Sequence, residues 1–290
     1  MNPIFNAAVI GDPIEHSLSP AIFQWLSQSL NSPVSYQKLR ISSQEWDDQS
    51  GVYSVLTALE GWNVTLPLKK KVISALDHLS EEASVLGAVN VVHRLKDQTL
   101  KGYNTDVLGV ARTLVEHEVS SQGQVGLIFG AGGAALAAAY ALGQLNAGAV
   151  WIWNRSPAHA TDLIERVRLV FPKTQFRNVS QSLNLRGEEQ PSLYINATPI
   201  GMKGYPRVFD LCKVMNSKAF AFDLVYSPQI TPFLEVAQRQ GLSFVGGLDM
   251  LVWQALATWE IWFGPLEHQS SLKSNLMQHL RESWATSMRR

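Results

Sequence analysis

Short apolar runs alternate with longer alanine-rich or amphipathic stretches along most of the chain, and polar or glycine-containing turns separate them. The apolar runs predict β-strands at 5–10, 34–41, 62–66, 88–92, 99–102, 125–129, 150–153 and 193–195. The longer stretches predict helices at 20–30, 67–79, 133–145 and 268–290, weak helicity at 44–60, and a helix that 102–107 opens and that ends near 117. Strand, turn and helix recur in both halves, which indicates an α/β protein.

The stretch 125–153 forms a βαβ unit with a glycine-rich first turn. Gly130 allows a tight turn after the first strand, Gly132 lets the backbone approach a pyrophosphate, and Ala135 is the third small residue of a GxGxxG/A pattern. Free N–H groups at the helix start would face the phosphate. We therefore expect a dinucleotide at Gly130, Ala131, Gly132, Gly133 and Ala134, the alternative being a glycine turn without a ligand.

The end of the second strand of this unit indicates which dinucleotide binds. An NAD site would place Asp or Glu about 20 residues beyond the glycines, and Asn154-Arg155-Ser156 stands there instead. A guanidinium and a hydroxyl suit a 2′-phosphate, so we expect NADP. The alternative for Arg155 is a solvated arginine at a strand end.

Composition sets mild limits on function. The 290 residues carry no net charge, so no basic face for nucleic acid is expected. Cys212 is the only cysteine, which excludes an internal disulfide and fits a reducing compartment. The N-terminus lacks the pattern of a signal peptide, and no apolar run reaches the ~18 residues of a membrane span. A cytoplasmic protein is expected.

Several polar residues stand where strands give way to helices or turns. Ser17 and Ser19 precede a helix; Ser19 before Pro20 fits an N-cap, while two hydroxyls with this spacing also suit a carboxylate ligand. Lys69 is expected in the first turn of a helix, where the helix dipole disfavours a cation, so it suggests another task. Asn90 lies within an apolar strand run and should have a buried partner.

Asp106 is expected in the first turn of the helix that ends near 117. A surface acid stabilised by the helix dipole is the ordinary role there.

Eight segments together resemble the shikimate dehydrogenase family over about residues 5 to 264. They are Ser17-Leu-Ser19, Asn63-Val-Thr-Leu-Pro-Leu-Lys69, Gly87-Ala-Val-Asn90, Asn104-Thr-Asp106, Gly130-Ala-Gly-Gly-Ala134, Asn154-Arg-Ser156, Asn196-Ala-Thr198 and Gly247-Leu-Asp-Met-Leu-Val-Trp-Gln254. The resemblance implies an α/β substrate domain and an inserted Rossmann NADP-binding domain with a cleft between them. The substrate domain would take 1–106 and the C-terminal helices 247–290, and the Rossmann domain 107–246.

The resemblance also implies residue roles. Ser17 and Ser19 would hold the substrate carboxylate. The remaining substrate contacts would be Asn63, Thr65, Lys69, Asn90, Asp106, Tyr226 and Gln254. Further cofactor contacts would be Asn196, Thr198, Leu224 and Gly247. Lys69 and Asp106 would be the catalytic acid–base pair, because a lysine can stabilise and protonate the alkoxide that forms as hydride reaches a ketone.

Three features depart from the family pattern. His159 stands where a second arginine usually follows Arg155, which would weaken the preference for NADP or make it depend on pH, since histidine titrates near neutrality. The loop 203–208 lacks acidic residues often seen there. Asp249 replaces a small residue and is expected to cap the following helix.

The first functional hypothesis is NADPH-dependent reduction of 3-dehydroshikimate to shikimate, a step of chorismate and aromatic amino acid biosynthesis. The alternatives are a quinate/shikimate dehydrogenase or related paralogue, and a non-catalytic NADPH-binding regulator. Ser19 favours shikimate over quinate, and Lys69 with Asp106 argues for catalysis. No metal is expected, and the partners would be small molecules, with the chain a monomer or homodimer.

The last stretch has Leu272, Leu276, Leu280 and Trp284 at i, i+4 spacing. This pattern predicts an amphipathic helix packed on the substrate domain, the alternative being a dimer contact.

Overall fold

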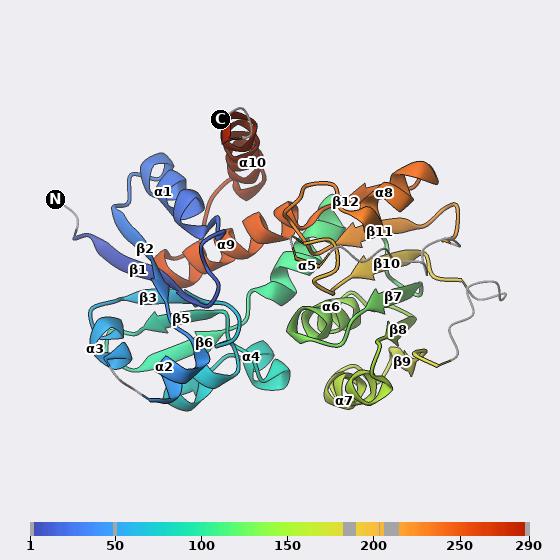
Figure 1. Cartoon of the computed structure of the whole chain (residues 1–290), viewed down its shortest axis with the longest axis horizontal. Helices are drawn as coiled ribbons and strands as arrows, with labels where there is room; N and C mark the ends of the chain where they lie inside the picture. Colours follow the sequence, from blue (N-terminus) through green and yellow to red (C-terminus); the bar gives the residue numbers. More distant parts are fainter. Residues whose placement is uncertain (1–2, 49–50, 182–189, 203, 206–214, 288–290) are drawn as a thin grey trace. The chain divides into compact units, whose positions relative to one another are not determined.

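The computed structural model describes residues 3–48, 51–181, 190–202, 204–205 and 215–287. The chain divides into two compact units (Figure 1). The first, the substrate unit, comprises Met1–Thr105 and Gln254–Arg290; the second, the nucleotide unit, comprises Asp106–Trp253. The expected divisions were 106/107 and 246/247, so the second division lies seven residues later, within helix α9 (Gly247–Phe263). Cys212 and most of the loop 203–208 lie outside the described residues.

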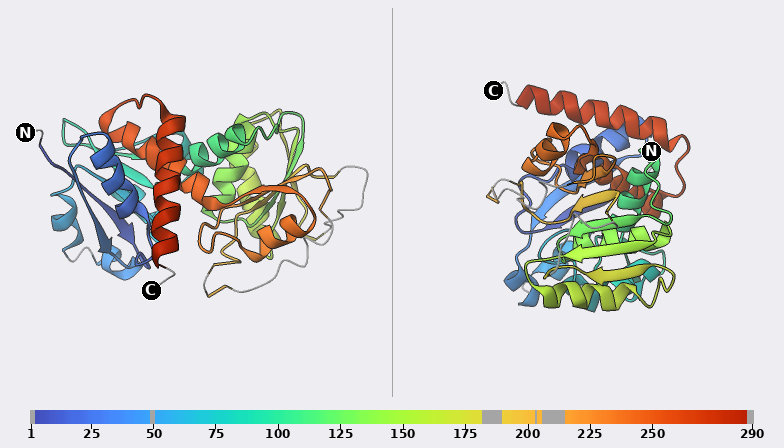
Figure 2. Two further views of the ribbon diagram at one scale, coloured as in Figure 1. Left: turned by 90° about the horizontal axis from the view of Figure 1, so that it is seen from above. Right: turned by 90° about the vertical axis from the view of Figure 1, so that its right-hand side faces the viewer.

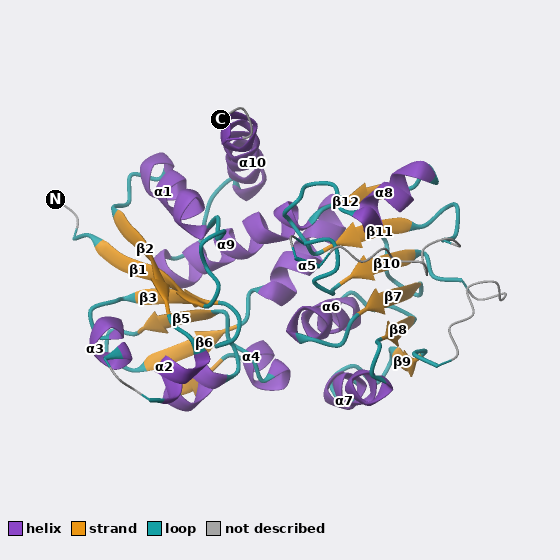
Figure 3. Ribbon diagram, viewed as in Figure 1, coloured by secondary structure: helices purple, strands orange, loops and turns teal. Residues whose placement is uncertain are grey.

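The substrate unit contains a mixed six-stranded sheet in the order β2-β1-β3-β5-β6-β4 (Figure 3). Its strands are β1 (Phe5–Gly11), β2 (Val34–Arg40), β3 (Gly61–Val64), β4 (His78–Leu79), β5 (Val91–Arg94) and β6 (Leu100–Tyr103). β1 pairs in parallel with β2 and β3, whereas β5 runs antiparallel to β3 and β6. One face of the sheet is covered by a core that includes fully buried Ile10, Trp62 and Leu68.

The helices of this unit are α1 (Ser19–Ser29), α2 (Ser43–Asp47), α3 (Val52–Leu56), the 3₁₀ helix η1 (Lys71–Ala75), α4 (Glu81–Leu86), the later part of α9 and α10 (Gln269–Ser287). α10 packs on α1 (Figure 2). The rings of Trp25 and His279 lie 6.3 Å apart. Leu276 and Leu280 are buried, as the i, i+4 pattern predicts, and Leu272 is half-buried; the side chain of Trp284 lies outside those described.

The predicted helix at 67–79 is wrong. Residues 66–70 form turns, η1 follows, and His78–Leu79 joins the sheet as β4 beside β6. The Asp77 carboxylate accepts a hydrogen bond from the Leu100 backbone N–H, at 2.8 Å, so pairing with the sheet outweighs local helical preference. Lys69 therefore lies in a turn, and the helix-dipole argument for it no longer applies.

The nucleotide unit is an all-parallel six-stranded sheet in the order β12-β11-β10-β7-β8-β9. Its strands are β7 (Val125–Phe129), β8 (Ala149–Trp153), β9 (Gln175–Asn178), β10 (Leu193–Asn196), β11 (Phe220–Asp223) and β12 (Ser243–Val245). The chain proceeds from β7 in one direction and from β10 in the other, as in a doubly wound Rossmann sheet. A ligand of such a sheet binds at the carboxyl ends of the strands beside this reversal.

The helices among the described residues of the nucleotide unit are α5 (Asp106–Glu116), α6 (Gly133–Gln144), α7 (Pro157–Val167), α8 (Pro232–Arg239) and the start of α9. The alanines of α6 are almost all buried, which lets this helix pack closely on the sheet. Within the described part of the chain, no helix is both long enough and apolar enough for a membrane span.

Candidate active site and cofactor site

Ser17 and Ser19 contact each other at the start of α1, of which Ser19 is the first residue. The Ser17 hydroxyl donates to that of Ser19 at 3.2 Å, and the Ser19 backbone N–H donates to the Ser17 hydroxyl at 3.3 Å. The N-cap residue of α1 is Leu18, and no side chain caps this helix. The N-cap role considered for Ser19 is therefore wrong, and both half-buried hydroxyls belong to one small polar group.

A half-buried tyrosine, Tyr36, links this group to Asn63. The Tyr36 hydroxyl donates to Asn63 Oδ1 at 2.7 Å. Burial raises the pKa of Tyr36 well above its ordinary value, and a hydrogen bond with the Ser19 side chain acts in the opposite direction. Asn63 Nδ2 donates in turn to the Asn90 carbonyl and to Thr258 Oγ1, each at 3.3 Å.

Asn90 has the buried partners that its place in the sequence predicted. Its Oδ1 accepts from the Thr105 backbone N–H at 2.8 Å, and its Nδ2 donates to Gln254 Oε1 at 3.2 Å. Gln254 lies one helical turn before Thr258, whose hydroxyl donates to the Gln254 carbonyl. The fold thus joins predicted substrate residues that lie 164 positions apart in the sequence.

Tyr36 and Thr258 were not identified from the sequence. Thr258 follows Gln254 by four residues, so helical spacing was a usable signal for it. Tyr36 occupies a half-buried position of β2 between exposed neighbours, and nothing local to it indicates a site.

Lys69 and Thr65 lie in the segment that follows β3, and both are half-buried. The Val89 backbone N–H donates to the Lys69 carbonyl at 2.8 Å, and Leu68, the residue before Lys69, is fully buried. The backbone of Lys69 is therefore fixed beside the segment that carries Asn90. Asp106 is 5% exposed, begins α5 and directly follows Thr105, the residue held by Asn90.

The glycine turn of the nucleotide unit has the expected form. Gly130 has φ +115°, and a Cβ there would lie 2.9 Å from the Ala197 carbonyl oxygen, so only glycine fits. A Cβ on Gly132 or Gly133 would meet nothing within 4 Å, and no side chain caps α6. The open backbone and uncapped helix start fit a pyrophosphate, and Ala131 and Ala134 complete the turn.

The turn after β8 leaves Arg155 exposed. Asn154 Nδ2 donates to the Ser156 carbonyl at 2.9 Å, which shapes the turn around the arginine. His159 is also exposed and lies in the first turn of α7, whose N-cap is Ser156. The side chains of Arg155 and His159 are exposed to solvent, so a phosphate group can reach them.

The remaining predicted cofactor residues, Asn196, Thr198, Leu224 and Gly247, lie at or just beyond the carboxyl edge of this sheet. A Cβ on Gly247 would lie 2.2 Å from the Leu224 carbonyl oxygen, and the Gly247 N–H donates to the Val225 carbonyl at 3.1 Å. The Asn196 side chain is fully buried and accepts from the backbone N–H and hydroxyl of Thr198. Half-buried Tyr226 follows, and burial raises its pKa.

Comparison with known proteins identifies the family. Residues 9–92 match the family model described as the shikimate dehydrogenase substrate binding domain. The chain is 36% identical over 276 residues to shikimate dehydrogenase (NADP(+)) of Desulfitobacterium hafniense strain Y51, covering 94% of this chain and 97% of that protein. This chain belongs to the shikimate dehydrogenase family.

Solved structures of family members have the same fold. Shikimate 5-dehydrogenase from Thermus thermophilus, in complex with NADP(H) and shikimate, superposes with a TM-score of 0.80 at 33% identity, covering 94% of this chain and 99% of that one. The Listeria monocytogenes enzyme, in complex with shikimate and NAD, gives a TM-score of 0.82 at 30% identity, covering 95% and 97%.

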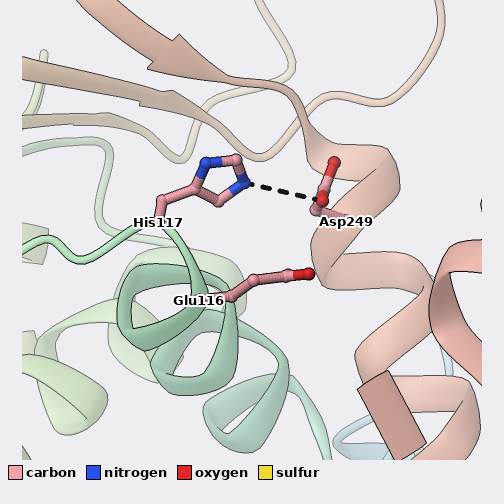
Figure 4. Close-up of side chains that lie close together, drawn as sticks. All are labelled: Glu116, His117 and Asp249. Carbon is pink, nitrogen blue, oxygen red and sulfur yellow. Dashed lines mark ion pairs between the residues drawn. The ribbon is translucent and has the colours of Figure 1, made fainter. Parts of the chain in front are cut away.

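A cluster of three polar side chains in this shikimate dehydrogenase family member was not expected from the sequence. One side-chain nitrogen or oxygen atom of each of Glu116, His117 and Asp249 lies within 4.8 Å of the other two (Figure 4). The spacing of these residues in the sequence had not indicated a metal site. His117 Nε2 lies 3.6 Å from Asp249 Oδ1, and Glu116 Oε2 accepts from the Trp253 indole N–H at 2.9 Å. The guanidinium of Arg112 lies over the Trp253 ring at 5.2 Å.

These contacts tie the end of α5 to the first turns of α9. Asp249 lies inside the first turn of α9 and pairs with His117, the residue directly after α5, and the capping role expected for it stays a prediction.

Proposed function

We propose that this protein is an NADP-dependent shikimate dehydrogenase that reversibly reduces 3-dehydroshikimate to shikimate. The observation that carries the proposal is the polar network of the substrate unit, which connects Ser17, Ser19, Asn63, Asn90 and Gln254. Hydroxyl and amide groups in one network suit a small polyhydroxylated ring with a carboxylate. Family membership supports the same substrate.

The residues of the network, and Thr65 and Tyr226 with them, have proposed tasks. The Ser17 and Ser19 hydroxyls donate to the substrate carboxylate. Asn63, Thr65, Asn90, Tyr226 and Gln254 bind the ring hydroxyls. Tyr36 and Thr258 orient Asn63 through the bonds at its Oδ1 and Nδ2, so the amide has one preferred orientation.

NADPH, when bound, supplies the hydride. The Lys69 ammonium stabilises the negative charge that develops on the substrate oxygen. Asp106 orients the ammonium and a substrate hydroxyl. Lys69 and Asp106 are assigned jointly as the source of the proton that this oxygen takes up.

The cofactor is held by the nucleotide unit. The backbone at Gly130, Gly132 and the start of α6 receives the pyrophosphate, and Arg155 receives the 2′-phosphate, with Asn154 and Ser156 shaping its turn. His159 lies in the first turn of the next helix and lacks the permanent charge of a second arginine. Asn196, Thr198, Leu224 and Gly247 line the nicotinamide end. The protein acts in the cytoplasm as a monomer or homodimer.

A panel of four assays tests the proposal. Purified protein is supplied with shikimate or quinate, each with NADP⁺ or NAD⁺, and kcat/KM is measured for each pair. Shikimate with NADP⁺ should give the highest value. A higher value for quinate would move the assignment to a quinate dehydrogenase, and no turnover with NADPH binding intact would indicate a regulator.

A further inference from the structure

A carboxylate is buried at the carboxyl end of β11. Asp223 is 0% exposed, and three donors converge on it. Its Oδ1 accepts from Asn196 Nδ2 and from the Val225 backbone N–H, each at 2.9 Å, and its Oδ2 accepts from the Thr231 hydroxyl at 2.5 Å. Every contact is a donor, so the site suits an ionised carboxylate, which is a pure acceptor.

The bond from Asn196 extends this arrangement to the end of β10. With its Nδ2 held by Asp223 and the Ile200 carbonyl, Asn196 turns its Oδ1 toward Thr198, whose N–H and hydroxyl donate to it at 3.0 and 2.7 Å. The Leu224 N–H also donates to the Asn196 carbonyl. One carboxylate thereby fixes two consecutive strand ends.

These strand ends are in contact with the other backbone segments of the cofactor edge. The Ala197 carbonyl lies against Gly130 in the glycine turn. The Val225 carbonyl accepts from the N–H of Gly247, where α9 begins. Asp223 therefore lies beneath the segments proposed to line the nicotinamide, although its own side chain is fully enclosed.

The carboxylate carries a cost in stability at neutral pH. Burial raises the pKa of Asp223 to about 6, and the bonds from Thr231, Val225 and Asn196 offset only part of that effect. The ionised form is thus less favourable in the folded chain than in the unfolded chain. A group that lowers stability, yet accepts hydrogen bonds from three separate segments, points to a role in shaping the loops above it.

We propose that Asp223 is a positioning residue that holds the segments 196–200 and 223–225 in the geometry that binds the nicotinamide half of the cofactor. The inference rests on the proposed NADP-dependent function and refines it. It separates the two halves of the cofactor site: the glycine turn and Arg155 hold the adenosine half, and Asp223 acts only on the other half.

The first experiment uses the full-length protein without cofactor. Amide hydrogen exchange is followed in the parent, in Asp223→Asn and in Thr174→Val. Thr174→Val is the control, because it removes a buried hydroxyl of the nucleotide unit that donates to the Ala147 carbonyl. In Asp223→Asn, where an NH₂ replaces an acceptor, the amides of Thr198 and Val225 should exchange at least about tenfold faster, the effect of losing about one hydrogen bond. Thr174→Val should leave these two amides unchanged.

The second experiment measures binding of NADPH and of 2′,5′-ADP, which lacks the nicotinamide half. Asp223→Asn should raise the Kd for NADPH by about tenfold. The Kd for 2′,5′-ADP should stay within about twofold of the parent value, the usual effect of a change away from a site. Thr231→Ser, which keeps the hydroxyl donor, should retain most of the affinity for NADPH.

Two results would overturn the positioning role. One is equal weakening of NADPH and 2′,5′-ADP in Asp223→Asn, which would indicate a general effect on the fold. The other is unchanged binding of both. A parent protein that fails to bind NADPH would instead contradict the proposed function, so the two failures are distinguishable.

Discussion

Asn90 Oδ1 accepts a hydrogen bond from the backbone N–H of Thr105 at 2.8 Å, which fixes the residue immediately before Asp106. The Asn90 amide also donates to Gln254. The Asn90 side chain therefore binds both the segment after β6 and helix α9, and it positions them beside β5, which begins at the next residue. Removing it should affect stability and catalysis together.

Asn90→Ala should lower the free energy of unfolding by about 1–3 kcal/mol, because the buried Thr105 N–H loses its acceptor. It should also reduce kcat/KM for shikimate. Thr105→Val is the matched control, since it removes a hydroxyl from the same group and keeps the N–H···Oδ1 bond. Chemical denaturation of both variants measures the difference, and an equal loss in the two would contradict the account of Asn90.

Lys69→Ala should lower kcat by several orders of magnitude while changing KM for shikimate little, because the lysine acts most strongly as the alkoxide forms. Lys70→Ala, at the exposed neighbouring position, is the control and should leave both constants near the parent values. Steady-state kinetics decide the matter. A kcat within about tenfold of the parent would remove Lys69 from catalysis.

Ser17→Ala and Ser19→Ala should each raise KM for shikimate by roughly tenfold, the loss expected for a hydrogen bond to a charged group. Neither should reduce the free energy of unfolding as the loss of a helix cap does, because no side chain caps α1. Kinetics and thermal unfolding of both variants test this pair of expectations. Unchanged KM values would exclude a carboxylate site at these hydroxyls.

Arg155→Ala should weaken NADPH about ten- to a hundredfold and NADH much less, because it removes a charged partner of the 2′-phosphate. His159→Arg should shift the preference further toward NADPH by adding a permanent charge. Arg168→Ala, an exposed arginine paired with Glu165 in the same unit, is the control. Titration with both cofactors gives the ratios, and equal losses for NADPH and NADH in Arg155→Ala would contradict a 2′-phosphate pocket.

The raised pKa of Asp223 predicts a pH dependence of stability. Its pKa is about 6 in the folded chain and near its ordinary value of 3.8 when unfolded. Its stabilising contribution is therefore complete below about pH 4 and is lost as pH rises through about 6. The groups that contact it, Asn196, Val225 and Thr231, carry no charge.

In the Asp223→Asn variant, the side chain at this position is an amide and does not titrate. The free energy of unfolding of the variant, relative to the parent, should therefore rise by about 2 kcal/mol between pH 4.5 and 7.5. Urea denaturation across this range measures it. A constant difference would show that the pKa of Asp223 is not raised.

The sequence predicted those parts of the fold and the site whose interacting residues lie close together in the chain. The glycine turn at Gly130 was predictable because strand, turn and helix are adjacent, and the buried partners of Asn90 were predictable from its apolar surroundings. The helix at 67–79 was wrong because pairing of β4 with β6 is a long-range effect. Tyr36 was missed because its partner Asn63 comes from another strand.

The Asp223 network was also missed from the sequence. Its three donors come from β10, the second residue after β11 and the N-cap of α8, and only the folded sheet brings them together. Sequence motifs identified the residues next to the ligands, whereas the buried groups that hold those residues required the tertiary structure.

The most direct test of the central claim follows the hydride itself. Purified protein is incubated with 3-dehydroshikimate and NADPH that carries deuterium at both C4 positions, and the product is analysed by mass spectrometry. The parent should form shikimate one mass unit heavier than the unlabelled compound, and Lys69→Ala should form almost none in the same time. Absence of shikimate, or shikimate without deuterium, would contradict the assignment of this protein as an NADPH-dependent shikimate dehydrogenase.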